Sequence, residues 1–290
     1  MSLKVLILGS TGLIGHQVYN YLNSTKKYKM FNLSFRKKLN KETIICNVRN
    51  EKKITEIIKS TRPDVIVNCI GILIKGSNSN PENAIFLNSY LPHFLMNLAN
   101  TINSKLIHIS TDCVFSGIKK DSYIENDFKD GIDTYAKSKG LGEIINMNHL
   151  TLRTSVIGPE LKTDGEELFH WFMKQSGVIN GYTKAIWSGV TTLILAKAVD
   201  LAIKNKIIGL YHVTNNKPIS KFKLLSLIKK YSQKNIIIKP FDKKVINKSF
   251  KDTRNELNLL IPTYEIMIRN MINHIKQNKN LYNHYKIKFE

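Results

Sequence analysis

Cysteine is scarce in this chain of 290 residues, and acidic residues are outnumbered two to one by basic residues. Cys46, Cys69 and Cys113 are scattered and odd in number, which argues against a disulfide framework. Their spacing matches no metal site, so we predict no bound metal. The longest apolar runs are far shorter than the roughly 18 residues of a membrane-spanning helix, and the first run is too short for a signal-peptide core. We therefore expect a cytoplasmic protein with no membrane partner.

The excess of positive charge is large, with 44 basic and 22 acidic residues giving a formal charge of +22. Such an excess can indicate a polyanionic partner. The basic residues are mostly lysines, asparagine and isoleucine are also abundant, and no run of arginines alternates with aromatic residues. This pattern is typical of a coding-sequence bias that acts on solvated positions. We predict no nucleic-acid partner, and a positive field that favours a phosphorylated small molecule.

Short apolar runs alternate with helical patterns through the first half of the chain. The apolar runs cover residues 3–8, 30–35, 65–67 and 105–109, and helical spacing covers 12–22, 51–60, 81–102 and 131–147. Parallel strands need long crossover connections, so the alternation predicts an α/β fold with a doubly wound parallel sheet of the Rossmann type.

The regularity weakens after Gly158-Pro159. We therefore divide the chain into residues 1–157, a cofactor-binding domain that carries the catalytic residues, and residues 158–290. The second segment is expected to be mixed, forming a smaller C-terminal substrate lobe and returning elements to the main domain. The tail after Ile275 is polar and rich in lysine, so we expect it to be a frayed terminal segment.

Three glycines follow the first apolar run at intervals of three residues, at positions 9, 12 and 15. The first permits a tight turn, the second lets the backbone approach a pyrophosphate, and the third lets a helix pack closely on a strand. The helix that follows offers unpaired N–H groups and a favourable dipole to phosphates. We predict a dinucleotide site here, formed by Gly9, Thr11, Gly12, Leu13, Ile14 and Gly15.

The second apolar run ends at basic residues, where an NAD-binding protein would carry a carboxylate for the ribose 2′-hydroxyl. Arg36, Lys37 and Lys38 stand there. Cations at this place would pair with a 2′-phosphate, so we predict NADP(H), with Arg36 as the leading contact, and NAD(H) as the less favoured cofactor. The alternative is that these are ordinary surface cations. Asn47 and Val48, after the next apolar run, are expected near the adenine.

Three further residues predict the chemistry. Thr111 lies at the end of the fourth apolar run, at the sheet edge where ligands bind. Tyr135 and Lys139 begin the next predicted helix, and their spacing places them on one helix face. A nearby ammonium would lower the pKa of Tyr135 toward neutrality, which suits an acid that protonates a carbonyl oxygen. Thr111 would orient that carbonyl, so we predict a nicotinamide-dependent oxidoreductase.

These segments resemble the extended short-chain dehydrogenase/reductase superfamily. Within it they are most similar to the nucleotide-sugar reductases of the dTDP-4-dehydrorhamnose reductase group. The matching motifs are Ser110–Gly117, Tyr135–Glu143 and Leu152–Ser155. Asn68–Gly71 resembles the segment that lines the cofactor, and Asn88 falls where an asparagine supports that site. The resemblance therefore adds Cys69, Ile70, Gly71, Asn88, Tyr135 and Lys139 to the cofactor-binding residues.

The resemblance implies NADPH-dependent reduction at C4 of a nucleotide-linked 4-keto-6-deoxyhexose in deoxysugar and polysaccharide biosynthesis. The nucleotide would be UDP or dTDP, and N-acetylated sugars are included. Thr111 would bind the keto oxygen, Tyr135 would protonate it, and Lys139 would hold the ribose. Asp112 and Cys113, beside Thr111, are expected to contact the substrate.

The second half supplies two more candidate substrate contacts. Residues 181–192 resemble a segment of reductase-like proteins associated with UDP-linked N-acetylated deoxysugars. Trp187 in that segment would lie over the substrate or fill the core of the lobe. Arg254 would contact the diphosphate or lie on the surface.

Alternatives to a plain reductase stay open. Cys113 falls where the related GDP-fucose synthase carries an epimerising cysteine. A bifunctional C3-epimerase/4-reductase, with His170 returning the proton, is therefore one alternative. A non-catalytic cofactor-binding regulatory subunit is another, although Tyr135 and Lys139 are retained. An epimerase or dehydratase that keeps its cofactor is a third, but Cys113 replaces the glutamate of the dehydratases. A homodimer is one option for the assembly.

Overall fold

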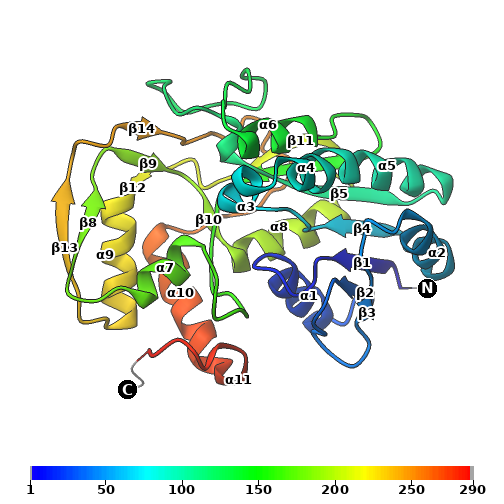
Figure 1. Ribbon diagram of the computed structural model, residues 1–290, viewed down its shortest axis with the longest axis horizontal. Coiled ribbons are helices and arrows are strands. Elements are labelled where there is room, and N and C mark those ends of the chain that lie inside the picture. Colours follow the sequence, from blue (N-terminus) through cyan, green and yellow to red (C-terminus); the bar gives the residue numbers. More distant parts are fainter. Residues whose placement is uncertain (1, 288–290) are drawn as a thin grey trace.

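The structure, a computed structural model, describes residues 2–287, and its centre is a parallel sheet. The strands of this sheet are β1 (Lys4–Leu8), β2 (Lys29–Ser34), β3 (Ile44–Ile45), β4 (Val65–Asn68), β5 (Lys105–Thr111), β6 (Leu150–Thr154) and β11 (Gly209–Val213). They form one seven-stranded sheet in the order β11-β6-β5-β4-β1-β2-β3, and every neighbouring pair is parallel (Figure 1). The predicted doubly wound α/β class is confirmed.

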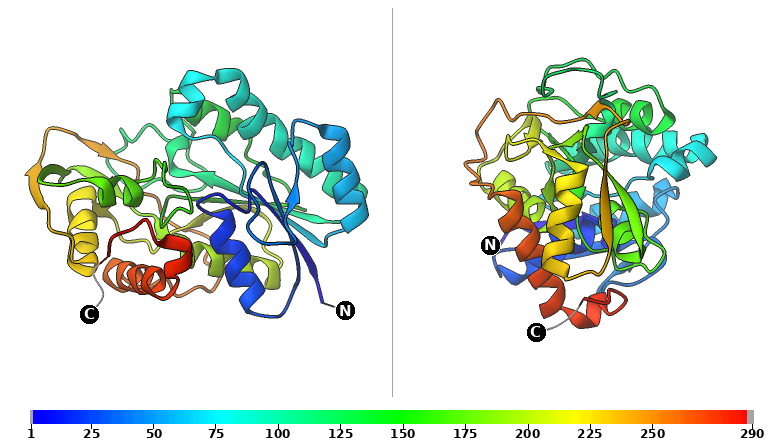
Figure 2. Two further views of the ribbon diagram at one scale, coloured as in Figure 1. Left: turned by 60° about the horizontal axis from the view of Figure 1, so that its bottom comes forward. Right: turned by 90° about the vertical axis from the view of Figure 1, so that its left-hand side faces the viewer.

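Apolar side chains cover both faces of the sheet, as expected for parallel strands that are buried on both sides. Along β1, Leu6 and Leu8 pack into one core cluster, whereas Val5 and Ile7 pack into the other. The helices α2 (Glu51–Thr61), α5 (Leu91–Thr101) and α6 (Thr134–Leu141) lie on one face, and α1 (Gly15–Ser24) and α8 (Thr192–Lys204) on the other (Figure 2).

The helix expected over residues 131–147 is shorter than predicted. The Asp133 side chain caps α6 by accepting a hydrogen bond from Ala136 N at 2.7 Å, and the helix ends at Leu141. A Cβ atom at Gly142 would lie 1.8 Å from the Asn88 carbonyl oxygen, so the chain passes another helix there at backbone distance. The prediction of helix as far as residue 147 was wrong because tertiary packing ends it.

The helix expected over residues 81–102 is divided into three elements. These are α4 (Pro81–Ala84), a π-helical turn η1 (Ile85–Tyr90) and α5. π-Helical turns are rare and occur often at functional sites. Here the turn carries Asn88, whose side chain is fully buried.

The second half of the chain contributes to two regions. α8 and β11 complete the main domain, whereas the smaller elements gather into a lobe at one end of the sheet, on the left of Figure 1. The lobe contains α7 (Leu168–Lys174), α9 (Lys221–Ser232), the pair β8 (Val178–Tyr182) and β13 (Ile237–Phe241), and the strands β9 (Ala185–Trp187), β12 (Ile219–Ser220) and β14 (Ile246–Asn247). A short pair, β7 (Val156–Ile157) and β10 (Val190–Thr191), lies between β6 and α8 in the chain path.

The expectation of a frayed tail was wrong. After α10 (Tyr264–Gln277) the chain forms α11 (Lys279–Tyr282), and Tyr282, Tyr285 and Ile287 are buried. The Tyr282 hydroxyl lies 2.9 Å from His16 Nε2 on α1. The apolar and tyrosine side chains of this segment are interspersed with lysines and asparagines, so its polar composition concealed residues that pack against the body of the protein.

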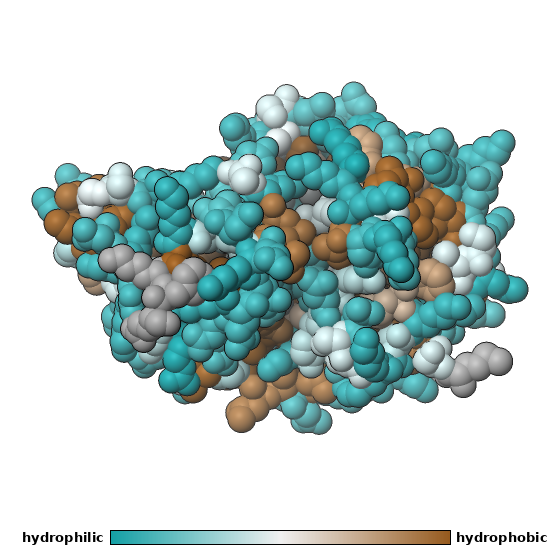
Figure 3. Space-filling model, turned by 90° about the horizontal axis from the view of Figure 1, so that it is seen from below, coloured by the Kyte–Doolittle hydropathy of each residue, from teal (hydrophilic) through white to brown (hydrophobic). Residues whose placement is uncertain are grey.

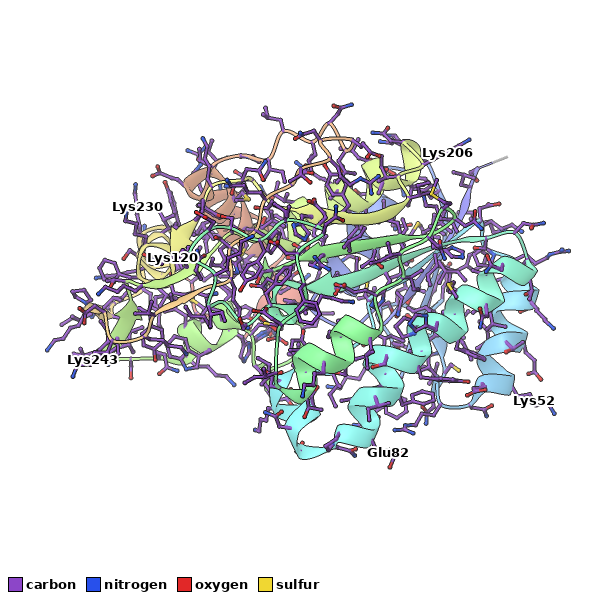
Figure 4. All side chains as sticks on the ribbon, turned by 90° about the horizontal axis from the view of Figure 1, so that it is seen from above. Lys52, Glu82, Lys120, Lys206, Lys230 and Lys243 are labelled. Atoms are coloured by element: carbon purple, nitrogen blue, oxygen red, sulfur yellow. The ribbon has the colours of Figure 1, made fainter. Side chains whose placement is uncertain are left out.

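The charged surface agrees with the interpretation of the lysines as solvated. Lys52, Lys120, Lys206, Lys230 and Lys243 are exposed, and Lys52, Lys206 and Lys243 lie at the periphery of the view in Figure 4. Hydrophilic residues also dominate the face shown in Figure 3, with hydrophobic residues in smaller patches between them. Among residues 2–287, no helix is both long and apolar enough to cross a membrane.

Candidate active site

A cleft of about 1410 Å³ separates the carboxyl edge of the sheet from the lobe. In doubly wound sheets, ligands bind at this edge, beside the point where the strand order reverses. One wall follows β1, β4, β5 and β6 with the segments 12–14, 69–76, 109–113 and 154–156. The other wall belongs to the lobe and its connections, chiefly the segments 160–168, 179–187 and 244–248.

The turn after β1 has the geometry of a phosphate-binding loop. Gly9 has a φ of +79°, a conformation that side chains disfavour. A Cβ at Gly15 would lie 2.2 Å from the Gly9 carbonyl oxygen, so only glycine lets α1 start this close to the turn. Among the described residues, none caps the start of α1 through its side chain, and its first turn carries no acid. The loop therefore fits a dinucleotide, because its N–H groups can donate hydrogen bonds to an anion.

The residues predicted around the adenosine end lie on the same edge, beyond the cleft. Arg36 follows β2, is exposed, and places its guanidinium 4.5 Å from the Phe35 ring. Asn47 follows β3 and is exposed, whereas Val48 is buried in the core cluster that also contains Ile54. Arg36 is therefore free to meet a phosphate, while the Val48 side chain is committed to the core.

Asn88 connects the cofactor wall to the catalytic helix. Its Oδ1 accepts a hydrogen bond from Ile72 N at 2.9 Å, and its Nδ2 donates to the Ile72 carbonyl oxygen and to Ser138 Oγ, both at 3.1 Å. Ser138 lies on α6 beside Lys139. Asn88 thereby fixes the segment that begins with Cys69, Ile70 and Gly71, all of which line the cleft.

The structure brings Thr111, Tyr135 and Lys139 together in the cleft. Thr111 ends β5, and Tyr135 and Lys139 lie on α6. Thr111 Oγ1 accepts a hydrogen bond from Cys113 N at 3.1 Å and donates to Asp112 Oδ1 at 3.1 Å. The predicted constellation therefore shares one site.

The acidity of Tyr135 differs from the expectation. Burial raises the pKa of Tyr135 well above its usual value, and a hydrogen bond with Thr111 only partly opposes this. The amine of Lys139 is directed toward the sheet, so it does not produce the expected lowering of the Tyr135 pKa. The phenol is thus held in its protonated form, as an acid must be before it donates.

Lys139 extends from α6 to β5. Its Nζ donates to the Ile109 carbonyl oxygen at 2.8 Å and lies 3.3 Å from His108 Nε2. Burial lowers the pKa of Lys139 to about 8, although Glu143 and Cys69 act in the opposite direction. Sequence reasoning missed His108, because only the strand register shows that it lies under the lysine.

A buried ion pair anchors the far end of the catalytic helix. The Glu143 carboxylate accepts from Arg153 Nε at 2.8 Å, Arg153 Nη2 at 2.7 Å and Ser110 Oγ at 2.7 Å. Burial raises the pKa of Glu143, but the Arg153 contacts outweigh it and the net shift is downward. Arg153 also lies 2.8 Å from His212 Nε2, so α6 is joined to β5, β6 and β11.

The residues proposed for epimerisation do not form a pair. Cys113 lines the cleft, but burial, with Asp112 next in size, raises the pKa of its thiol to about 12. His170 is buried on α7, with Nδ1 2.8 Å from the Tyr285 hydroxyl and Nε2 3.2 Å from the Thr163 carbonyl oxygen. Both ring nitrogens face the protein interior, so the assignment of His170 as a proton donor to substrate was wrong.

The lobe wall carries charged groups that the sequence did not single out. Lys221, Lys244 and Lys248 line the cleft. Lys221 Nζ lies 5.0 Å from the ring of Trp187, and Lys244 Nζ lies 5.0 Å from the ring of Tyr182. In a chain with 44 basic residues, these lysines had no distinguishing signal.

Trp187 is both a core and a cleft residue. It is almost fully buried, its indole N–H donates to Ser155 Oγ at 2.7 Å, and it lines the cleft. Glu167 lies in the same wall, where burial, followed by the neighbouring Glu160, raises the pKa of its carboxyl to about 7.

Arg254 lies away from the cleft, contrary to the prediction of a diphosphate contact. Its Nη1 donates to the carbonyl oxygens of Ile208 and Leu210, at 2.6 and 2.9 Å, and its Nη2 lies 2.6 Å from Glu256 Oε1. These partners are at the amino end of β11, whereas the cleft is at the carboxyl edge. Arg254 holds the start of a strand.

The fold and this constellation define a member of the extended short-chain dehydrogenase/reductase superfamily. The sequence model of the family described as the RmlD substrate binding domain matches residues 3–256 of this chain, so the chain belongs to this family. The resemblance inferred from the motifs is thereby confirmed at the level of the family.

Individual relatives show both the reach and the diversity of the family. The dTDP-4-dehydrorhamnose reductase of Aggregatibacter actinomycetemcomitans is 25% identical over 228 residues, 75% of each chain. The Bacillus anthracis dTDP-4-dehydrorhamnose reductase, solved in complex with NADP, shares the fold with a TM-score of 0.82 and 22% identity over 94% of this chain and 100% of that one. The methionine adenosyltransferase 2 subunit beta of Danio rerio is 32% identical over 153 residues, 50% of this chain and 44% of that protein.

Proposed function

We propose that this protein is an NADPH-dependent reductase of the C4 keto group of a nucleotide-linked 4-keto-6-deoxyhexose. The nucleotide is UDP or dTDP, and N-acetylated sugars are within the proposed range. The observation that carries the proposal is the meeting of Thr111, Tyr135 and Lys139 in a cleft that starts at a glycine loop. The dTDP-4-dehydrorhamnose reductases among the relatives support the choice of substrate.

The roles of the residues follow from their protonation and position. When bound, NADPH supplies the hydride. Tyr135 is a buried phenol with a raised pKa, so it enters the reaction protonated and donates to the oxygen that gains negative charge. Thr111 orients that oxygen with its hydroxyl, and Lys139 holds the ribose side of the cleft. Asp112, which accepts from Thr111, fixes the threonine rotamer.

The choice of cofactor rests on two features of this chain. The uncapped start of α1 and the turn at Gly9 and Gly12 fit a pyrophosphate. Arg36 is exposed after β2 and can pair with a 2′-phosphate. The presence of NADP in the solved relative from Bacillus anthracis agrees with this choice.

The lysines of the lobe wall support an anionic substrate. Lys221, Lys244 and Lys248 face the same cleft as Asp112 and Tyr135. An ammonium held beside an aromatic ring can meet both a phosphate and a base or sugar face. We assign these lysines to the diphosphate of the nucleotide sugar. Arg254, which lies at the other edge of the sheet, has no part in this assignment.

The test is turnover with a defined substrate. The protein should consume one NADPH for each UDP- or dTDP-linked 4-keto-6-deoxy sugar reduced, and product analysis identifies the nucleotide and the sugar. Tyr135→Phe should lower kcat by about 10²- to 10⁴-fold, with the Kd of NADPH changed less than about twofold. Tyr90→Phe, at an exposed helix position, is the matched control and should behave as the wild type.

Two outcomes would overturn the proposal. Equal turnover of Tyr135→Phe and wild type would remove the phenol from the chemistry. NADPH binding without turnover of any UDP- or dTDP-linked 4-keto sugar would favour the non-catalytic subunit. Assembly as a homodimer is a separate proposal, checked by analytical ultracentrifugation.

A further inference from the structure

A buried asparagine and histidine lie directly beneath Lys139. Asn68 ends β4 and His108 lies in β5, and the two are register partners in the parallel pair. Both side chains have no exposed surface. Their contacts run from the cofactor wall to the catalytic lysine, since Asn68 Nδ2 lies 3.2 Å from His108 Nδ1 and His108 Nε2 lies 3.3 Å from Lys139 Nζ.

The backbone decides which way the Asn68 amide points. Its Oδ1 accepts a hydrogen bond from Ile70 N at 3.1 Å, so the oxygen is fixed on that side. The NH₂ group, which can only donate, therefore faces His108 Nδ1. Nδ1 must then be the acceptor nitrogen of the imidazole. Because burial holds the pKa of His108 well below its usual value, the ring is neutral and carries its single proton on Nε2.

This tautomer creates a conflict with a charged lysine. The Nε2–H bond of His108 points at Lys139 Nζ, and an ammonium group has three donors and no acceptor. Moving the proton to Nδ1 only transfers the conflict to the Asn68 amide. The neutral amine removes it, because its lone pair can accept from Nε2–H while one N–H still donates to the Ile109 carbonyl oxygen.

Other groups around Lys139 also affect the equilibrium between its ammonium and its neutral amine. Glu143, just after α6, and Cys69, after β4, favour the ammonium, whereas burial disfavours it. Glu143 is already paired with Arg153 at 2.7 Å, so much of its field is compensated. Tyr135, one helical turn away, is protonated and carries no charge in the resting protein.

We propose that Asn68 and His108 are positioning residues that shift Lys139 from its ammonium form toward its neutral amine. This inference rests on the proposed reductase function for its significance, although its geometry does not depend on turnover. In its ammonium form, Lys139 can give one proton to the phenolate left on Tyr135. The product is the neutral amine that Asn68 and His108 stabilise, and the amine later regains a proton from solvent. A permanent ammonium would supply only a fixed charge.

The first experiment reads the tautomer directly. Protein labelled with ¹⁵N in its histidine side chains is examined by NMR with saturating NADP⁺, and His108→Gln assigns the His108 signals. We expect Nε2 to be protonated and Nδ1 to be unprotonated between pH 6 and pH 8, and His149→Gln to leave these signals in place. His149 is a matched control because it lies at the opposite edge of the same sheet, bonded to Leu106 N and Asn100. Protonation on Nδ1 would overturn the proposal.

The second experiment moves the proton. Asn68→Asp keeps an oxygen for Ile70 N and places another opposite His108 Nδ1, so the ring should become the Nδ1–H tautomer and Nε2 should accept from the ammonium. The pH at which the ¹³Cε resonance of Lys139 titrates should rise by about one unit or more. Asn68→Ser provides a neutral acceptor and should give the same tautomer with a smaller rise, which separates hydrogen bonding from added charge.

The outcomes distinguish this inference from the proposed function. An unchanged tautomer and lysine titration in both Asn68 variants would overturn the positioning role. In the active enzyme, the alkaline limb of the kcat profile should move up with the lysine titration, while His149→Gln leaves it in place. A protein with the expected tautomer and no reductase turnover would overturn the proposed function and leave this inference standing.

Discussion

The two walls of the cleft are held by different physical means. On the sheet side, a buried ion pair between Glu143 and Arg153 joins the end of the catalytic helix to β6, and the buried amide of Asn88 joins this helix to the Ile72 segment. On the lobe side, the Tyr285 hydroxyl holds the segment that begins at Glu160 through neutral hydrogen bonds: it accepts from Glu160 N and pairs with His170 Nδ1. The lobe strands are also short, several of them only two or three residues long.

The difference agrees with what each wall must do. A proton donor has to stay within hydrogen-bond reach of one oxygen, so a rigid support is of direct benefit. The substrate wall has to admit and release a large anionic molecule, and a wall held by a few neutral contacts can open at lower free energy. Disturbing each support separately should therefore give different defects.

The largest expected effect comes from the buried ion pair. Arg153→Met removes the arginine from the buried Glu143 carboxylate and leaves it only Ser110 and Lys129, so the free energy of unfolding should fall by about 3 kcal/mol. Urea unfolding measures this change. Arg269→Met, an exposed change of the same type, should alter stability by less than about 0.5 kcal/mol. Equal stability of the two variants would show that the pair does not anchor the helix.

The two buried tyrosines of the C-terminal segment offer a paired test of the comparison. Tyr285→Phe removes partners from Glu160 N and His170 in the lobe wall, whereas Tyr282→Phe removes a partner from His16, which contacts the Gly12 carbonyl oxygen. Each loss should lower stability by about 1–3 kcal/mol. Tyr285→Phe should raise the KM of the sugar nucleotide several-fold and leave NADPH binding nearly unchanged. Tyr282→Phe should weaken NADPH binding several-fold and leave the KM of the sugar nucleotide nearly unchanged.

Fluorescence titration with NADPH and initial-rate kinetics on both tyrosine variants measure these constants. If both variants change the Kd of NADPH and the KM of the sugar nucleotide to the same extent, the two walls do not act separately.

A smaller effect is expected at the exposed end of the cofactor wall. Arg36→Ala should weaken NADPH binding by about tenfold, equivalent to roughly 1.4 kcal/mol, because it removes a charge-assisted contact with the 2′-phosphate. NADH lacks that phosphate, so its Kd should not change. Lys52→Ala, an exposed cation on α2, is the control for general loss of charge. If the Kd values of NADPH and NADH rise equally, Arg36 acts only through the general positive charge of the surface.

The smallest expected effect is a pH dependence of the lobe wall. Burial and Glu160 raise the pKa of Glu167 to about 7, so the carboxyl is neutral below this pH and charged above it. Sugar-nucleotide affinity should fall as the pH rises through 7, because the new charge repels phosphate. Glu167→Gln should flatten this dependence.

The same shift affects stability. The pKa of Glu167 in the folded protein lies above its ordinary value of 4.5, so the folded state holds the proton longer than the unfolded state. The contribution of Glu167 to the free energy of unfolding is present in full below pH 4.5 and is lost as the pH rises through 7. Thermal unfolding of Glu167→Gln should therefore show a gain over wild type at pH 8 that disappears at pH 4.5. Exposed Glu56→Gln should show no such trend.

The parts of the protein that local patterns determine could be predicted. The apolar runs at residues 3–8 and 105–109 formed β1 and β5, and glycines at fixed intervals formed the turn before α1. The placement of Thr111 at a strand end and of Tyr135 and Lys139 on one helix face also needed only local geometry. These features depend on spacing along the chain, which the sequence displays.

Features that depend on long-range contacts could not be predicted. The end of α6 is set by the approach of Gly142 to Asn88, and the orientation of His170 is set by Tyr285. Asn68 and His108 are 40 residues apart and meet only through the register of two strands. The cleft lysines, among them Lys221, had no compositional contrast with the solvated lysines around them.

The packing of the C-terminal segment also sets an order of events during synthesis. Tyr282 and its partner His16 are separated by 266 positions, so their hydrogen bond can form only when nearly all of the chain has left the ribosome. At roughly 5–20 residues per second, the glycine loop exists for many seconds before the contact that supports it. During synthesis the N-terminal domain therefore exists with α1 incompletely packed. The packing of α1 is completed only when α11, the last helix to be made, docks against it.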